Sequence, residues 1–485
     1  MEINDLPFGL HGTKEVIIFT IFCLINASWI YLFFVSIRHH LTIPIIKSWS
    51  KTNVARLTKL PRDKLKTINL HHEIESITSF YKRGKFHSYF ARSSSNGNSY
   101  FPLVSVIIPA RNEQMHIERC LYSLIDQNYP NFEIIVIDDN STDATLKIIQ
   151  KIKNVQTILP SDRLKIISLV DKPEDWTGKT WASHQGYLNS KGKILLFTDA
   201  DTYYKSRNAI LQTVSYMQKE KLQVLTGIPF LELSDFWSKM VMPLWNLFYE
   251  ILGSNPSEIN NPKSKVGYLM GSFFIIYKDI FEQVGTFRAV RNTIQEDKAL
   301  GSLIKEAGYN MKIIKIHEIM SATWSRDLSS LWHGIGRSLA HYGLESRRHI
   351  VKDCLIIFCM AAVPFILLPY TSAGLIQDHF NSTLASSSSS SSSSPFVMLK
   401  IGVSITEHSL LLLNILSCMM IIIGTAVKGL VKYKLNPVYS FMSCPAVFFI
   451  LVVYCMNIIP LFMSKKIKAF SWRGRIYINN TYKKS

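Results

Sequence analysis

Two aspartates that follow a short apolar segment have the residue types to bind a divalent cation. Asp199 and Asp201 stand one residue apart, directly after the segment Ile194–Thr198. Their carboxylates can hold a hard cation such as Mg²⁺ or Mn²⁺, which neutralises the charge that builds on a departing diphosphate. Aspartate after a strand is also a common turn former. The pair alone therefore leaves a metal site and a simple turn both open.

A second acidic pair, Asp138 and Asp139, ends the apolar segment Phe132–Ile137. One interpretation is structural, with Ser141 or Asp143 capping the helix that follows. The other is functional, because a carboxylate at a strand end can accept a hydrogen bond from a nucleotide base. The two interpretations are compatible.

A third acidic cluster, Gln295, Glu296 and Asp297, begins a helical segment that runs to Lys305. Acidic residues in a first turn are favoured by the helix dipole alone. A carboxylate here can also act as a general base that takes a proton from an acceptor hydroxyl.

The elements expected to position these residues are strands that alternate with helices. The expected strands are 104–108, 132–137, 164–169 and 193–198, and the expected helices are 117–126 and 142–151. This alternation predicts an α/β fold with a mostly parallel sheet and helices on both faces. In such sheets the ligand site lies at the carboxyl ends of the strands, where Pro109, Asp139 and Asp199 fall.

The composition indicates a chain that is partly embedded in lipid. Hydrophobic residues make up 47%, charged residues 18%, and the formal net charge is +19. A basic chain suits an anionic membrane face or phosphate-bearing substrates. Nucleic acid is the competing partner, but no nucleic-acid motif is present, so we expect none to bind. The seven cysteines form no CxxC pair and indicate small buried side chains without a disulfide framework.

Long apolar segments flank the polar region. Val16–Ile37 is long enough to cross a membrane, and the absence of a clear cleavage site favours an anchor over a signal peptide. Segments 354–374 and 408–427 are also long enough, whereas 436–463 contains Pro445 and Pro460 and suggests a re-entrant or proline-broken element. Four simple spans from an outside N-terminus would put the basic tail outside, whereas the positive-inside rule puts it inside.

These features give five expected domains. They are a transmembrane anchor at 1–40, a basic juxtamembrane linker at 41–100, a catalytic domain at 101–348, transmembrane helices at 349–464 with a Ser-rich loop at 375–400, and a basic tail at 465–485. The aromatic, Met-rich segment Phe236–Leu252 is equally well explained as a core helix or as an interfacial helix that guides a lipid.

Five sequence blocks, in order and spacing, resemble the family 2 glycosyltransferases, the inverting group with a GT-A fold. The blocks are Val104–Glu113, Val136–Asp143, Gly178–Ala182 with Gly186, Asp199–Asp201, and Gly271–Ser272 with Gln295–Asp297. The resemblance covers about half of the chain, and each block alone is unspecific.

The resemblance implies a role for each matching residue. The residues expected to bind the donor are Pro109, Ala110, Arg111, Glu113, Asp139, Lys179 and Asp199. Asp201 and Asp199 are expected to bind Mg²⁺ or Mn²⁺, and Asp297 with Glu296 is expected to carry out catalysis. The residues expected on the acceptor side are Gly271, Ser272, Trp332 and Arg337. In this scheme Lys179 approaches the diphosphate and Asp297 is the base.

Two further segments, Asp175–Lys179 and Trp472–Arg475, are similar to a membrane-bound subgroup that includes hopanoid-associated and carotenoid-acid glycosyltransferases. This predicts transfer from a UDP- or GDP-sugar to a membrane lipid, by a multi-pass protein of the cell membrane with a cytoplasmic catalytic domain. The Gln-x-x-Arg-Trp motif of processive synthases is absent, which argues against polymer synthesis. A polysaccharide synthase is the first alternative, and a catalytically idle scaffold that binds sugar nucleotides is the second.

Overall fold

The computed structural model describes residues 13–47, 101–154, 163–252, 256–293, 295–345, 347–387, 395–463, 469–472 and 475–478. The chain forms two compact units. One unit contains residues 43–231 and 256–323, and we call it the α/β unit. The other contains residues 1–42, 232–255 and 324–485, and we call it the helical unit.

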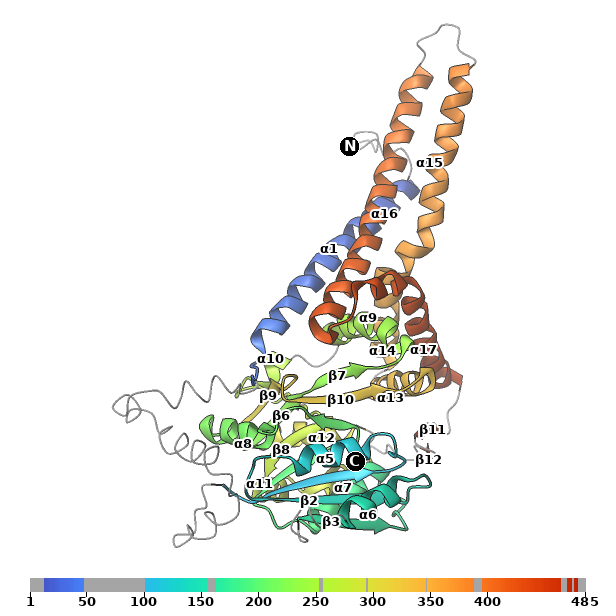
Figure 1. The fold of residues 1–485 in the computed structure, drawn as a ribbon. Coiled ribbons are helices and arrows are strands. Elements are labelled where there is room, and N and C mark those ends of the chain that lie inside the picture. Colours follow the sequence, from blue (N-terminus) through green and yellow to red (C-terminus); the bar gives the residue numbers. More distant parts are fainter. Residues whose placement is uncertain are drawn as a thin grey trace, which may run out of the picture. The chain divides into compact units, whose positions relative to one another are not determined.

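The described part of the α/β unit is built on a seven-stranded sheet with the order β3-β2-β1-β4-β8-β6-β9 (Figure 1). Its strands are β1 (Val104–Ala110), β2 (Phe132–Asp139), β3 (Leu164–Leu169), β4 (Ile194–Thr198), β6 (Val224–Ile228), β8 (Phe273–Tyr277) and β9 (Met311–Lys315). Neighbours pair in parallel except that β8 runs antiparallel to both β4 and β6. The expected α/β fold with a mostly parallel sheet is confirmed. A three-stranded sheet has the order β5 (Thr202–Tyr204), β10 (Met320–Ser325), β7 (Phe230–Leu233).

Helices cover both faces of the large sheet because its strands are apolar on both faces. The helices are α5 (Ile117–Ile125), α6 (Thr145–Asn154), α7 (Gly178–Leu188), α8 (Ala209–Lys219), α10 (Pro256–Ile259), α11 (Lys278–Gln283), η3 (Thr286–Val290) and α12 (Glu296–Glu306). Alternate residues of β1 enter opposite cores: Val106 and Ile108 pack with α5, α6 and α8, whereas Ile107 packs with α7, α11 and α12. This alternation is the period of two that a strand imposes.

Two predicted strands extend further than the sequence indicated. β1 includes Pro109, whose place in the strand pairs it with Ile137, and β2 includes both Asp138 and Asp139. The helix after β2 begins at Thr145, and its amide donates to Asp143 Oδ1 at 2.9 Å. Of the two capping candidates, Asp143 therefore caps the N-terminus of this helix.

A glycine fixes the position of α7 on the sheet. A Cβ at Gly186 would lie 2.4 Å from Ile107 Cγ2 and 2.6 Å from Ile137 Cδ1. Only glycine leaves room for this close approach between a helix and two strands. The N-terminal half of α7, which carries Lys179, is thereby held over the carboxyl ends of β1 and β4.

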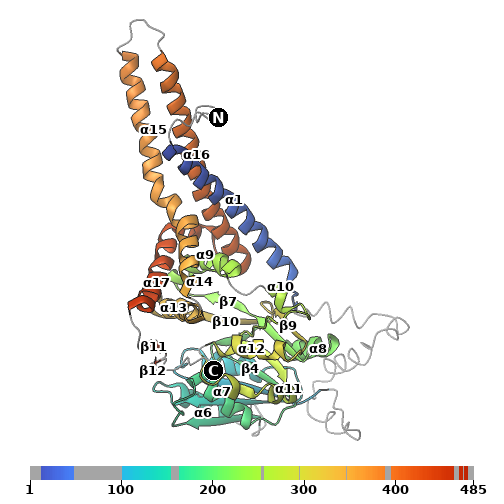
Figure 2. The same cartoon turned by 180° about the vertical axis from the view of Figure 1, so that it is seen from behind.

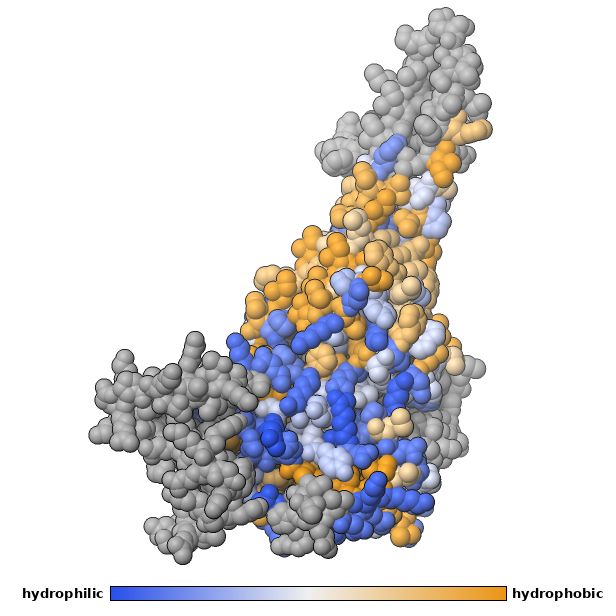
Figure 3. Space-filling model, in the orientation of Figure 1, coloured by the Kyte–Doolittle hydropathy of each residue, from blue (hydrophilic) through white to orange (hydrophobic). Residues whose placement is uncertain are grey.

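The described part of the helical unit has four helices long and apolar enough to cross a membrane. Its elements are α1 (Thr13–Thr42), α9 (Phe236–Leu252), α13 (Leu328–Glu345), α14 (Arg347–Ile357), η4 (Phe358–Ala362), α15 (Val363–Ser387), α16 (Pro395–Tyr433), η5 (Pro437–Met442), α17 (Ser443–Met463), β11 (Ala469–Trp472) and β12 (Arg475–Ile478). Apolar side chains such as Leu24, Phe34 and Leu412 are more than half exposed along α1 and α16, which form the orange surface in Figure 3. Such a surface is suited to lipid rather than to water.

Polar groups inside the helical unit join its helices. Asn26 Nδ2 on α1 donates to Ser417 Oγ on α16 at 3.0 Å. Trp29 Nε1 donates to the carbonyl of Met360 in η4 at 3.0 Å. Hydrogen bonds of this kind hold apolar helices together where burial of apolar surface provides no driving force.

The aromatic helix α9 is a core helix of the helical unit. Val241, Leu244, Leu247 and Phe248 are buried, and the helix packs against α1, α16 and α17. Among the side chains of α9 that the structure describes, only those in its first turn, with Phe236 and Trp237, are substantially exposed, which favours the core interpretation over the interfacial one. The division also differs from the expected domain boundaries, because residues 232–255 and 324–348 group with the apolar helices and not with the sheet.

Two expectations for the C-terminal helices are corrected. The loop expected at 375–400 is helical up to Ser387 and again from Pro395, because α15 and α16 continue beyond their apolar segments and lie side by side (Figures 1 and 2). The segment 436–463 is not broken by proline, because α17 is continuous. Pro445 lies in its first turn, where an amide would have no partner within the helix, and Pro460 lies in its last turn. The linker residues 48–100, the Ser run 388–394 and most of the basic tail lie outside the described residues.

Candidate active site

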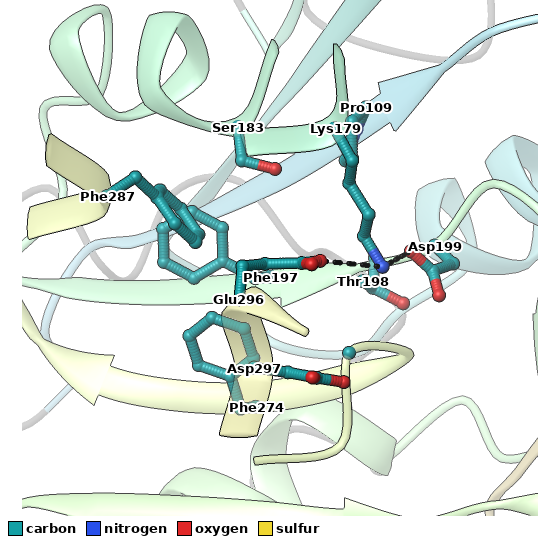
Figure 4. A pocket seen from close by; sticks show the side chains of 11 residues that line it. Pro109, Lys179, Ser183, Phe197, Thr198, Asp199, Phe274, Phe287, Glu296 and Asp297 are labelled. Carbon is teal, nitrogen blue, oxygen red and sulfur yellow. Dashed lines mark ion pairs between the residues drawn. The ribbon is translucent and has the colours of Figure 1, made fainter. Parts of the chain in front are cut away.

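The carboxyl ends of β1 and β4 border a small cavity in the α/β unit (Figure 4). Its lining comprises Pro109, Lys179, Ser183, Phe197, Thr198, Asp199, Gly271, Phe274, Phe287, Glu296 and Asp297. Six of these residues were predicted as site residues from the sequence: Pro109, Lys179, Asp199, Gly271, Glu296 and Asp297. They come from distant parts of the chain, so the fold gathers a cation and three carboxylates around one cavity.

The ammonium of Lys179 lies between carboxylates of two elements. Its Nζ is 2.7 Å from Asp199 Oδ1 and 3.7 Å from Glu296 Oε1 (Figure 4). Burial would lower the pKa of this amine, but the charges of Asp199 and Glu296 outweigh it and raise the pKa of Lys179 above its usual value. Lys179 therefore stays positively charged at the cavity, between carboxylates that hold its ammonium in place.

A side chain at Gly271 would obstruct both Lys179 and Asp297. A Cβ there would lie 2.9 Å from Lys179 Nζ and 3.1 Å from Asp297 Oδ2. The glycine thus keeps the amine and the carboxylate open to the same small volume. This is the clearest geometric sign that the predicted base and the predicted phosphate-binding lysine belong to one site.

Two facing glycines, Gly267 and Gly301, set the distance between α12 and the segment that carries Gly271. A Cβ at Gly301 would lie 2.7 Å from the amide nitrogen of Tyr268, and the amide of Leu269 donates to the carbonyl of Asp297 at 3.3 Å. The first turn of α12 is therefore fixed against the strand-like segment before β8.

We expect Gly301→Ala to displace α12, because the obstructing atoms are backbone atoms that have no alternative rotamer. The melting temperature of the purified full chain in detergent should fall by several degrees. The exposed Glu306→Ala, on the same helix, serves as the matched control and should leave the melting temperature within about a degree. An unchanged melting temperature for Gly301→Ala would contradict the close packing described here.

The loops after β1 and β2 interlock beside the cavity. Arg111 Nη1 donates to the carbonyl of Asn140 at 2.8 Å, and the amide of Asn112 donates to Ser141 Oγ at 3.1 Å. Both Asn112 and Asn140 adopt a φ of 54°, a left-handed conformation that asparagine tolerates better than most residues. Of the predicted donor-site residues, Arg111 thus supports the backbone of the Asp139 loop, rather than lining the cavity.

Three other predicted residues lie outside the cavity lining. Ala110, Glu113 and Asp139 are buried, and the amide of Glu113 donates to Thr145 Oγ1 at 2.7 Å. Ser272 contributes its carbonyl oxygen, which accepts a hydrogen bond from Thr198 Oγ1 at 3.0 Å.

The acceptor-side residues Trp332 and Arg337 belong to α13 of the helical unit. Trp332 packs edge-to-face on Phe449 of α17, with ring centroids 5.7 Å apart. The side chain of Arg337 lies outside the described residues. Their role on the acceptor side stays a prediction.

A row of buried, hydrogen-bonded hydroxyl groups stabilises the Asp199–Asp201 turn. Thr202 Oγ1 is 2.8 Å from the carbonyl of Asp199 and 3.1 Å from Thr198 Oγ1. Thr198 must donate to the carbonyl of Ser272, because a carbonyl can only accept, so the single hydroxyl hydrogen of Thr202 points either to Asp199 or to Thr198. The chain ties the acidic turn to the segment that contains Gly271.

Cys120, which the sequence marks only as a small buried residue, extends this chain. Its Sγ lies 3.6 Å from Thr202 Oγ1 and 3.8 Å from the carbonyl of Asp199. Burial raises the pKa of the Cys120 thiol to about 12, so the group keeps its hydrogen and is a donor.

We expect Thr202→Val to destabilise the site, because it removes a buried hydroxyl that hydrogen-bonds the carbonyl of Asp199 or the hydroxyl of Thr198, at nearly constant volume. The cost of about 1–3 kcal/mol should appear as a melting temperature several degrees lower. Thr202→Ser keeps the hydroxyl and should retain most of the stability. Equal melting temperatures for the valine and serine variants would show that the hydroxyl chain contributes nothing.

Asp201 is the remaining predicted metal ligand. It is partly exposed, follows Ala200 at the end of β4, and its carbonyl accepts the amide of Thr323 at 3.1 Å. Within the described ranges no three His, Cys, Asp or Glu side chains gather closely enough to hold a metal ion by themselves. Two carboxylates fit Mg²⁺ or Mn²⁺ if a bound diphosphate supplies further oxygen ligands.

The apolar part of the cavity is not predictable from the sequence motifs. Phe197, Phe274 and Phe287 come from β4, β8 and η3, and Ser183 comes from α7. The spacing of Lys179 and Ser183, four residues apart in a helix, was a signal that they share a face. The three phenylalanines gave no such signal, because in the sequence they look like ordinary core residues.

The model of glycosyl transferase family 2 matches residues 105–285, which include β2, β4, all of β1 but Val104, and the acidic pair Asp199 and Asp201. The resemblance noted from the sequence motifs is thus confirmed.

Two curated relatives match parts of this domain. One is named "Putative teichuronic acid biosynthesis glycosyltransferase TuaG", from Bacillus subtilis, and is 30% identical over 126 residues, 26% of this chain and 46% of the relative. The other, 4,4'-diaponeurosporenoate glycosyltransferase of Staphylococcus aureus, is 24% identical over 200 residues, 41% of this chain and 50% of the relative. The chain spans about half the length of these relatives.

Among solved structures, the chain is similar to the mannosyltransferase PcManGT from Pyrobaculum calidifontis in complex with GDP-Man and Mn²⁺. The identity is 14%, the TM-score is 0.42, and the match covers 85% of this chain and 99% of the other.

Proposed function

We propose that the chain is an inverting glycosyltransferase that moves one sugar from a UDP- or GDP-sugar to a membrane lipid. The observation that carries the proposal is the approach of Lys179 Nζ and Asp297 Oδ2 to the same space at Gly271. An amine that stays charged suits a diphosphate, and a carboxylate beside it suits proton removal from an incoming hydroxyl.

In the proposed reaction, Asp297 accepts the proton of the acceptor hydroxyl. The hydroxyl oxygen attacks the anomeric carbon, the bond from that carbon to the diphosphate oxygen breaks, and the nucleoside diphosphate leaves with the electron pair. Lys179 lies where it can offset the charge that develops on the leaving group, and Glu296, 3.7 Å from Lys179, helps to orient the amine. Attack from the side opposite the leaving group inverts the anomeric configuration.

Asp201 and Asp199 would hold Mg²⁺ or Mn²⁺ in this proposal. A bound divalent cation supplies charge neutralisation on the diphosphate. Asp199 forms an ion pair with Lys179 in the structure, so a metal cation would compete with the amine for this carboxylate or share it. The S. aureus relative is named as a glycosyltransferase of 4,4'-diaponeurosporenoate, which supports a lipid acceptor.

The proposed location is the cell membrane, with several crossings and a cytoplasmic catalytic domain. The support is the four apolar helices and the basic residues, such as Lys428, Lys432 and Lys434, near the end of α16. The sequon at Asn381–Thr383, which follows the apolar part of α15, offers a topology reporter. In a host that glycosylates such sites, modification of Asn381 would support its placement outside and opposite to the catalytic domain.

The test is a panel of radiolabelled UDP- and GDP-sugars incubated with the purified full chain, a divalent cation and lipid extracts. We expect label in the lipid fraction, as single additions. Long products would favour a polysaccharide synthase instead. Tight donor binding without turnover on any extract would favour an idle scaffold.

A further inference from the structure

Of the described segment Asp175–Lys179, only the last residue lines the candidate active site. The other four form the turn that leads into α7. Thr177 is the N-cap of this helix, and its side chain accepts the amide of Thr180 at 3.3 Å. Trp176 is buried and stacks on His184 of α7, with ring centroids 4.9 Å apart. The segment is thus fixed to the helix that carries the site lysine.

Arg291 contacts this segment with both its backbone and its side chain. Its carbonyl oxygen accepts the amide of Thr177 at 2.9 Å and lies 3.1 Å from Thr180 Oγ1. Its Nε donates to Asp175 Oδ2 at 2.6 Å. The ion pair is about half exposed and contributes little, whereas Thr180 is fully buried. The contact at the Arg291 carbonyl is therefore the stronger of the two.

The Thr180 hydroxyl lies between two carbonyl oxygens. Thr180 Oγ1 is 3.1 Å from the carbonyl of Thr177 and 3.1 Å from that of Arg291. Its single hydrogen can point to only one of them at a time. In both arrangements a buried hydroxyl fills the polar space between the start of α7 and the segment that contains Arg291.

That segment leads to the acidic first turn of α12. Arg291 directly follows η3, whose Phe287 and Val290 are buried in the core of the α/β unit. Glu296 comes five residues after Arg291, and Asp297 is next. The contact at Arg291 therefore joins the element that carries the amine of the site to the chain segment that carries its two α12 carboxylates.

We propose that Thr180 and Arg291 are positioning residues, which hold the Lys179 ammonium at its distance from Glu296 and Asp297. The inference rests on the proposed transferase function, in which Lys179 offsets the charge of the leaving diphosphate and Asp297 takes the proton. Both groups act only when they are held at the right distance as the bond breaks, and a displacement of about 1 Å can cost about a hundredfold in rate. A smaller shift of the start of α7 should therefore lower turnover more than donor binding.

The test replaces Thr180 in the purified full chain in detergent, with the UDP- or GDP-sugar that the labelled panel identifies as donor. Thr180→Val removes the buried hydroxyl at nearly constant volume. We expect kcat to fall about tenfold while the donor KM changes by less than about threefold, the pattern of a contact that matters in the transition state. Thr180→Ser keeps the hydroxyl and should recover at least about half of the rate.

Thr213→Val is the matched control for a purely structural effect. Thr213 is fully buried in α8 of the same unit, and its hydroxyl lies 2.9 Å from the carbonyl of Ala209 and 3.0 Å from that of Ile210. It does not line the cavity. This variant should lose about as much melting temperature as Thr180→Val and keep the kcat and KM of the unmodified chain.

Hydrogen exchange gives a second measurement that needs no substrate. In Thr180→Val we expect faster amide exchange in peptides that cover residues 177–182 and also in those that cover 295–301, because one contact holds both segments. Thr213→Val should leave both sets unchanged. If Thr180→Val does not fold, Arg291→Ala replaces it; this change removes only the exposed ion pair, so kcat should fall about threefold at constant KM, and exchange should rise in both segments.

The outcomes separate the two proposals. A kcat for Thr180→Val no lower than that of Thr213→Val, or an equal loss in the serine variant, overturns the positioning role and leaves the transferase function standing. If the unmodified chain transfers no sugar from any donor, the transferase function fails, and hydrogen exchange then decides the contact by itself. Unchanged exchange at 295–301 in the Thr180 variant, or in the Arg291 variant that replaces it, overturns the link between α7 and α12.

Discussion

Asp297→Asn is expected to lower the rate of sugar transfer by about a thousandfold, because an amide cannot accept the proton of the acceptor hydroxyl. The substitution changes one atom of the side chain, and the Asp297 carbonyl would still accept the amide of Leu269, so α12 should hold its place. The nucleotide-sugar Kd should change by less than about threefold. The measurement pairs initial rates of lipid labelling with calorimetric donor binding.

The control for this variant is Asp279→Asn, an exposed acidic residue in the first turn of α11. It has the same chemical change at a comparable helix position but does not line the cavity. Its rate should match that of the unmodified chain. Normal turnover by Asp297→Asn would place the base elsewhere, whereas loss of both rate and donor binding would make Asp297 a binding residue.

The parts of the site that were predictable from the sequence lie at strand ends. A parallel sheet brings its carboxyl ends to one edge, so Pro109 and Asp199 had to be neighbours once their strands were identified. Asp297 could be assigned only through the resemblance, because the first turn of a helix is acidic for reasons unrelated to catalysis.

The unpredicted parts depend on contacts between distant segments. Phe287 lies about a hundred residues after Ser183, and nothing local marks it as facing a cavity. The placement of α9 in the helical unit was undetermined for a similar reason. A helix buried among other apolar helices and one lying in a membrane surface have the same aromatic, Met-rich composition.

The full length of the apolar helices could also not be predicted from the sequence. Hydropathy gives the length of a membrane crossing, but a helix continues as long as its backbone bonds and its neighbour support it. α15 and α16 pair along their length and so run past the expected loop boundaries at 375 and 400.

Asp201→Ala is expected to reduce transfer by about a hundredfold or more, since neutralisation of the leaving diphosphate contributes several kcal/mol. Asp199 would remain, paired with Lys179 at 2.7 Å, and one carboxylate already engaged by an amine is a poor cation site. The residual activity should therefore need a much higher Mn²⁺ concentration for half-saturation. The measurement is a Mn²⁺ titration of the transfer rate at fixed donor and acceptor, with Asp279→Ala as the control.

The direction of the Mn²⁺ shift separates two roles for Asp201. If Asp201 is a ligand, its loss raises the half-saturating concentration and lowers the rate at saturation. If Asp201 only shapes the turn through its carbonyl bond to Thr323, the alanine variant keeps that bond and should titrate like the unmodified chain. Full activity of Asp201→Ala in the presence of a chelator would rule out the metal role, and Lys179 alone would then have to offset the charge of the departing diphosphate.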